Sequence, residues 1–122
     1  MVDLKTLRIV DDFTVRPSKT RMQDIHYSDL CWFDGALYAL LRENRVIVKI
    51  DPKRRRILAE YSFHQMEQAP ERAYRTTYPT STMEGLAVDK NHFWLVTDNN
   101  GWGRKQFPND TRPTLFKCRR PD

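Results

Sequence analysis

Four short segments of mainly apolar residues follow one another along the chain, and turn residues separate them. They read SDLCWFD, ALYALL, RVIVKID and RILAEYSF, and they are rich in β-branched and aromatic side chains. Asp34-Gly35 separates the first two, and Asp51-Pro52-Lys53 opens the turn between the last two. This pattern predicts strands rather than helices, arranged as a four-stranded antiparallel meander over residues 28–63.

The same pattern returns later in the chain. SDLCWFDGALYALLREN, from Ser28, aligns without a gap with EGLAVDKNHFWLVTDNN, from Glu84, at a constant offset of 56. After an insertion, VIVKID from Val46 matches TLFKCR from Thr114. Two copies of a small meander are typical of propeller blades. The alternative is a chance likeness between two amphipathic hairpins.

The fold class that follows is all-β: a partial β-propeller of two four-stranded antiparallel blades. We expect a single partial propeller domain over residues 1–122, with one repeat at about 28–63 and another at about 83–120. The second repeat supplies three strands, so we expect residues 4–10 to be a strand lent to a neighbouring blade. Two blades cannot close a ring. Either blades are missing, or copies assemble head to tail, three chains giving six blades.

The composition of the chain gives limited information on what kind of molecule it binds. Hydrophobic residues make up 39% of the chain, charged residues 30%, and the net charge is +5. No apolar run approaches the roughly 18 residues of a membrane span, and no signal peptide is visible. The basic run over residues 53–56 is expected to be a solvated turn at the other end of the blade from Glu84. We therefore expect neither nucleic acid nor a membrane as partner.

The second repeat begins and ends with oxygen-bearing side chains. In a blade, the start of the innermost strand and the end of the next strand meet at one mouth of the channel. That geometry brings Glu84, Asp98, Asn99 and Asn100 together, and the first repeat adds Asp29, Glu43 and Asn44 at the same face. Carboxylate and amide oxygens suit calcium, and Glu84, Asp98, Asn99 and Asp29 are the candidate metal ligands. The alternative is that these groups cap strand ends.

Two long loops are expected to enter the same face. The insertion, residues 101–112, carries Arg104, Lys105 and Arg112, and with Asn100 these are candidate ligands for an anionic or ester small molecule. The other loop, residues 64–82, connects the two repeats and is long enough to be functional. The alternative is a pair of polar surface loops.

The sequence contains no motif typical of an enzyme with a serine or cysteine nucleophile. The three histidines, His26, His64 and His92, have no Ser or Cys in a nucleophile-elbow context. Cys31 and Cys118 sit in apolar runs without metal-type spacing, which predicts buried thiols, with a disulfide between them as the alternative. If the protein hydrolyses a substrate, we expect water to attack an ester or phosphoester polarised by a metal.

The two repeats also resemble a known family. MEGLAVD, FWLVTDNNG and RPTLFKCR resemble the closing part of the phytase-like β-propellers, the family labelled "esterase-like activity of phytase". DLCWFDGALYALLRENRVIVKID resembles the preceding blade. The resemblance covers residues 23–121 and implies calcium near the channel and an exported or periplasmic protein. Two features depart from the family: most blades are missing, and Asp29 is the nearest carboxylate where the family carries a Glu.

These observations favour a phytase-like propeller module with metal-assisted hydrolysis of an ester or phosphoester at the channel mouth. The alternative is a non-catalytic propeller scaffold that binds a ligand or protein. A nucleic-acid binder using the basic run ranks last.

Overall fold

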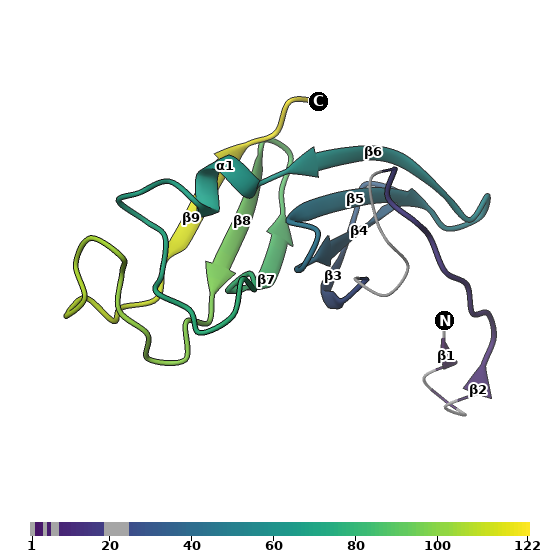
Figure 1. The fold of residues 1–122 in the computed structure, drawn as a ribbon. Coiled ribbons are helices and arrows are strands. Elements are labelled where there is room, and N and C mark those ends of the chain that lie inside the picture. The colour runs from purple at the N-terminus through teal and green to yellow at the C-terminus, as the bar shows by residue number, and fades with distance from the viewer. Residues whose placement is uncertain (1, 4, 6–7, 19–24) are drawn as a thin grey trace.

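In the part of the chain that the structure describes, antiparallel sheets of four and three strands lie next to each other, and a separate two-stranded sheet lies at the N-terminal end (Figure 1). The computed structural model describes residues 2–3, 5, 8–18 and 25–122. The first sheet contains, in order, β3 (Tyr27–Phe33), β4 (Ala36–Leu41), β5 (Val46–Asp51) and β6 (Arg56–Ser62). The second contains β7 (Met83–Val88), β8 (His92–Thr97) and β9 (Leu115–Arg119). The protein is therefore mostly β, as predicted.

The predicted four-stranded meander is confirmed in the first sheet. Asp34 and Gly35 form the two-residue hairpin loop between β3 and β4, with φ angles of 46° and 75°. Two positive φ angles match the right-handed twist of the flanking strands, and a glycine adopts the second at little cost.

The two sheets repeat each other in register. Leu30 pairs with Ala39 in the first sheet, and Leu86 pairs with Leu95 in the second, 56 residues further along both strands. The register shifts also correspond, since one lies between Tyr27 and Asp29 and the other between Met83 and Gly85.

The third strand of each sheet follows the same rule at a longer offset. Tyr38 pairs with Lys49, and its counterpart Trp94 pairs with Lys117, so the third strands correspond at an offset of 68. The difference between 68 and 56 is the 12 residues of the insertion. In the part of the chain that the structure describes, the second sheet has no fourth strand.

One hydrophobic core joins the two sheets. It contains Tyr38, Leu40 and Ile47 from the first sheet and Phe93 and Leu95 from the second. The ring of Phe93 lies 5.9 Å from that of Tyr38, edge to face. Cys31 and Cys118 border this core as half-buried free thiols, so no disulfide joins them.

The N-terminal region covers the other face of the first sheet. Residues 11–17, here called the cover segment, place Phe13 and Val15 on a second core that includes Leu41 and Val48. Before it, β1 (Val2–Asp3) pairs with β2 (Arg8–Ile9). Leu4, Thr6 and Leu7 of the expected lent strand lie outside the described residues, and Lys5 is in a turn. A strand lent to another blade stays a prediction.

The loop between the sheets contains the short helix α1 (His64–Glu67). We call residues 64–82 the connector. Within the described part of the chain, no helix has the length and apolar character needed to cross a membrane.

Candidate functional site

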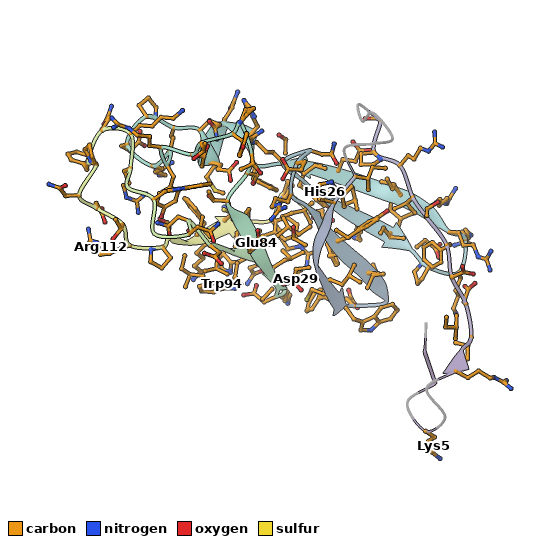
Figure 2. The ribbon with its side chains drawn as sticks, turned by 60° about the horizontal axis from the view of Figure 1, so that its bottom comes forward. Lys5, His26, Asp29, Glu84, Trp94 and Arg112 are labelled. Atoms are coloured by element: carbon orange, nitrogen blue, oxygen red, sulfur yellow. The ribbon has the colours of Figure 1, made fainter. Side chains whose placement is uncertain are left out.

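Asp29 and Glu84 come from different repeats and lie near each other where the inner strands meet (Figure 2). Asp29 Oδ2 accepts a hydrogen bond from the backbone N–H of Leu86 at 2.7 Å, which ties β3 to β7. Its Oδ1 accepts the N–H of Leu30 at 2.8 Å. Asp29 therefore satisfies backbone groups across the junction of the two sheets.

Arg42 lies between two of the acids at this end of the sheets. Its Nε is 3.0 Å from Glu43 Oε1, and its Nη1 pairs with Glu84. Partial burial opposes the charge of Arg42, but the hydrogen bonds and charges of Glu84 and Glu43 outweigh it and raise the arginine pKa. Arg42 was not among the predicted site residues, although a cation next to Glu43 at the end of an apolar strand is a usable signal.

The Asp-Asn-Asn cluster after β8 does not act as one group. Asp98 Oδ1 accepts the backbone N–H of Asn100 at 3.0 Å. Asn99 is instead buried, and its amide nitrogen donates to the carbonyl of Trp102 at 2.6 Å and to that of Thr111 at 2.9 Å. Asn99 therefore holds the two ends of the insertion together.

The predicted calcium ligands are thus divided among other partners. Glu84 pairs with Arg42, Asp29 binds backbone amides, and Asn99 belongs to the insertion. Among the residues that the structure describes, no three His, Cys, Asp or Glu side chains gather as a metal site would require. The donor set does not fit calcium as it is arranged here, and the calcium site stays a prediction.

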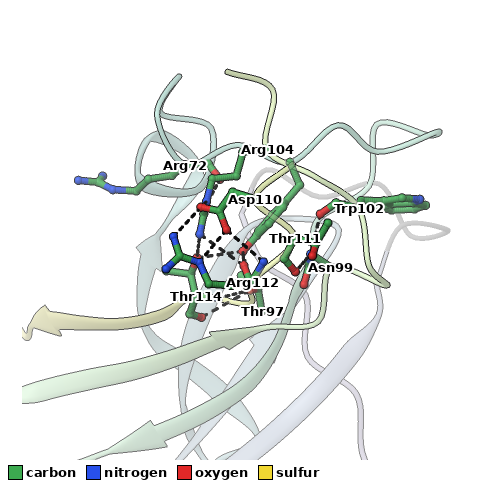
Figure 3. A network of polar contacts seen from close by, with 10 residues as sticks. Arg72, Thr97, Asn99, Trp102, Arg104, Asp110, Thr111, Arg112 and Thr114 are labelled. Atoms are coloured by element: carbon green, nitrogen blue, oxygen red, sulfur yellow. Dashed lines mark hydrogen bonds and ion pairs between the residues drawn. The ribbon is translucent and has the colours of Figure 1, made fainter. Parts of the chain in front are cut away.

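The insertion has an acid at its centre that engages two of its three basic residues (Figure 3). Asp110 binds Arg104 Nε at 3.0 Å and Arg112 Nε at 2.9 Å. The side chain and backbone N–H of Arg112, together with Arg104, hold the pKa of Asp110 well below its usual 3.8.

Arg104 also links three parts of the chain. Its guanidinium donates to the carbonyl of Arg72 at 2.9 Å and to Thr114 Oγ1 at 2.7 Å, and it lies 4.8 Å from the ring centre of Tyr74. Its side chain is 12% exposed, whereas that of Arg112 is 84% exposed. The contacts of Arg104 are those of a structural link, and a ligand role for either arginine stays a prediction.

The connector and the insertion pair along a short stretch of backbone. Tyr74 and Arg104 form an antiparallel bridge, and the N–H of Lys105 donates to the carbonyl of Ala73 at 2.8 Å. Gly103 is required because a Cβ there would lie 1.8 Å from the carbonyl oxygen of Pro108. The two long loops therefore form one unit at one end of the second sheet.

A small polar cavity opens within this unit, and we call it the connector pocket. Its volume is about 260 Å³. Its lining residues come from the β4–β5 turn, the connector and the insertion: Arg45, His64, Glu67, Gln68, Tyr74, Thr76, Pro79, Thr80, Thr82 and Lys105. Of the predicted ligand residues, Lys105 lines this pocket, and Arg112 lines a separate hollow within the insertion.

Glu67 holds one wall of the connector pocket. It is 4% exposed, and its carboxylate binds Arg45 Nε at 2.7 Å, Ser81 Oγ at 2.6 Å and the N–H of Thr82 at 2.9 Å. A buried carboxylate with this many partners is fixed in place. No local sequence pattern predicts that Glu67 and Arg45, 22 residues apart, form an ion pair.

The histidines occupy separate places. His64 lines the connector pocket, and His26 lies just before the start of β3, one residue before Tyr27 (Figure 2). His92 Nδ1 is 3.3 Å from Asp89 Oδ1 in the β7–β8 turn. The structure therefore does not bring the three together.

The basic run lies in the β5–β6 turn and is ion-paired. Arg54 binds Asp51 at 2.9 Å, and Arg55 binds Asp11 of the cover segment at 2.6 Å. Arg55 therefore fastens the cover segment to the first sheet.

Comparisons with protein-family models, with curated proteins and with solved structures find no match to this chain.

Proposed function

We propose that this chain is a phytase-like propeller module that binds a small anionic ligand in the connector pocket. The observation that carries the proposal is the charge of that pocket. Two basic residues, Arg45 and Lys105, line it together with one acid, Glu67, which leaves one formal positive charge in excess. The repeated register of the two sheets supports the propeller part of the proposal.

The charged groups of the pocket are arranged so that one cation remains for a ligand. Arg45 neutralises Glu67 through Nε. Within the described residues, Lys105 has no acidic partner. Its backbone is held in place because its N–H donates to the carbonyl of Ala73 in the connector. An ammonium without an acidic partner can attract an anion without first having to break an ion pair.

The size of the pocket limits the ligand. A volume of about 260 Å³ is near the lower end of small-molecule sites, which makes a phosphate, a carboxylate or a small phosphoester the fitting class. Thr76 donates its hydroxyl to the Tyr78 carbonyl and Thr80 donates to Glu43, so neither is the main anion donor. Lys105, the free Nη groups of Arg45 and the His64 ring are the proposed contacts.

Calorimetry with phenyl phosphate and inorganic phosphate tests this site. We expect Lys105→Gln to weaken binding at least about tenfold, and Lys105→Arg to retain most of it because the charge remains. Lys53→Gln, which removes an equal charge in the β5–β6 turn, is the matched control and should change nothing. Equal weakening by Lys53→Gln, or none by Lys105→Gln, would contradict the site.

The second candidate is the calcium-dependent hydrolysis of an ester or phosphoester that the family resemblance implies. The strands that carry Asp29 and Glu84 lie side by side at the junction of the two sheets, but Glu84 would have to leave Arg42 before it could bind a metal. Calorimetry with calcium at millimolar concentration tests it, together with an assay on aryl phosphoesters. A calcium signal that Glu84→Gln abolishes supports this candidate, and no heat in the wild-type protein removes it.

A further inference from the structure

The two sheets pack together through faces whose residues are not counterparts at the 56-residue offset. Tyr38 and Leu40 of β4 point into the shared core. The residues of β8 that meet them are Phe93 and Leu95, whose counterparts in β4 are Leu37 and Ala39. Each sheet therefore has two kinds of face, and a face of the first kind packs on a face of the second kind. Such a contact is heterologous and can be repeated by further sheets.

The second sheet exposes to solvent the face that corresponds to the buried, core-forming face of the first sheet. Val96 is 41% exposed and Leu115 is 66% exposed. Their counterparts Leu40 and Ile47 are 0% and 2% exposed in the core between the sheets. We call this surface the open face of the second sheet; it contains Ala87, Trp94, Val96, Leu115 and Lys117.

The first sheet exposes part of the complementary kind of face. Leu30 is 55% exposed, whereas its counterpart Leu86 is 8% exposed against the first sheet. Trp32 is 62% exposed, whereas its counterpart Val88 packs against the shared core. One molecule therefore carries, on opposite sides, the two halves of the contact that it already makes once inside itself.

The cover segment fills this second half incompletely. Val15 is 6% exposed on the sheet, and its backbone carbonyl accepts the Tyr27 hydroxyl at 3.0 Å. A mainly apolar hollow of about 410 Å³ nevertheless remains between the segment and the sheet, with Phe13, Leu30 and Leu37 in its wall. A packed sheet interface leaves no hollow of this size.

We propose that the open face of the second sheet docks on the first sheet of a second copy of this chain, head to tail. The cover segment competes for the same surface and moves aside when the second copy binds. The partner is another copy because the chain itself carries both complementary faces. Three such contacts close a ring of six sheets, the assembly that the repeat predicts.

Two exposed positions allow the contact to be blocked from either side. Leu115→Glu places a charge on the open face of the second sheet, and Trp32→Glu places one on the first sheet. Both side chains are mostly exposed, so the fold of the single chain should tolerate the changes. Phe107→Glu is the matched control, since Phe107 is 58% exposed in the insertion, which belongs to neither face.

Light scattering on a sizing column measures the outcome. The wild-type and Phe107→Glu proteins should rise with concentration above the 14.6 kDa of one chain, towards three times that mass. Leu115→Glu and Trp32→Glu should each stay monomeric. An equimolar mixture of the two variants should form a dimer, because each retains the face that the other lacks, and it should grow no further.

Three results would overturn the proposal. One is a mixture that stays monomeric while the wild type associates. Another is association of either blocked variant alone, which would mean that like faces pair. The third is a wild-type protein and a Tyr27→Phe variant that both stay monomeric at every concentration. Tyr27→Phe loses the hydrogen bond to Val15 that holds the cover segment, so it should associate at lower concentration than the wild type.

Discussion

The two sheets have the same strand register but different surroundings, and the comparison separates what local sequence decides from what packing decides. Equivalent strand pairs match residue for residue, including the register shift in the inner strand. Equivalent side chains nevertheless differ, since Leu40 is fully buried and Val96 is 41% exposed. The pattern of apolar residues therefore sets the pairing, and the position of each sheet in the stack sets which face is buried.

The largest expected difference lies between these two positions. Leu40→Ala should lower the free energy of unfolding by about 3 kcal/mol, because it leaves a cavity in the shared core. Val96→Ala should cost only about 0.5 kcal/mol in the isolated chain. Urea unfolding at a concentration where the protein is monomeric measures both. Equal costs would mean that the two sheets do not stack as described.

The second difference concerns the insertion, which the first sheet lacks. Arg104→Lys should lower the unfolding free energy by about 2 kcal/mol, because lysine cannot reproduce the buried guanidinium's several hydrogen bonds. Arg112→Lys, at an exposed position paired with the same acid, should cost less than about 0.5 kcal/mol. Thermal unfolding of both variants checks the order, and a larger loss for Arg112→Lys would contradict it.

The third difference is a pH dependence that belongs to the insertion. The folded-state pKa of Asp110 lies below its ordinary 3.8, so its contribution to stability is present above about pH 4. That contribution is lost as the pH falls below this value towards the folded pKa. Asp110→Asn should therefore show a smaller loss of stability than the wild type between pH 5 and pH 2. Parallel curves for the two proteins would exclude this role.

The smallest difference lies between two equivalent lysines. Lys117 Nζ is 4.8 Å from the ring centre of Trp94, and Lys49 Nζ is 5.8 Å from that of Tyr38. Lys49 also binds Asp122 at 3.2 Å. We expect Lys117→Gln to cost roughly 0.5 kcal/mol and Lys49→Gln roughly 1 kcal/mol. Urea unfolding measures both costs, and a larger loss of stability for Lys117→Gln than for Lys49→Gln would contradict this order.

The strands and the repeat could be predicted from the sequence because both depend on local alternation and turn residues. The Asp34-Gly35 hairpin and the 56-residue offset are examples, and both appear in the structure. The roles of single polar residues could not be predicted in the same way. Asn99 turns into the insertion, since two carbonyls there need a donor.

The ion pairs of the acids and arginines could not be predicted either, because their partners are far away in the sequence. Glu84 pairs with Arg42, 42 residues away, and Arg104 is buried by the connector. The cover segment had no recognisable pattern, because its role follows from the apolar face that the first sheet leaves open. Sequence alternation tells which residues share a face, but it does not tell what covers that face.

Nuclear Overhauser contacts between aromatic rings show whether unlike faces of the two equivalent sheets meet in the core. We expect contacts from Phe93 to Tyr38 and to Tyr61, whose ring centres lie 5.9 Å and 4.9 Å away. We expect none between Tyr38 and its counterpart Trp94 within one molecule. A Tyr38–Trp94 contact in place of the Phe93 contacts would mean that like faces meet, and the head-to-tail arrangement would be wrong.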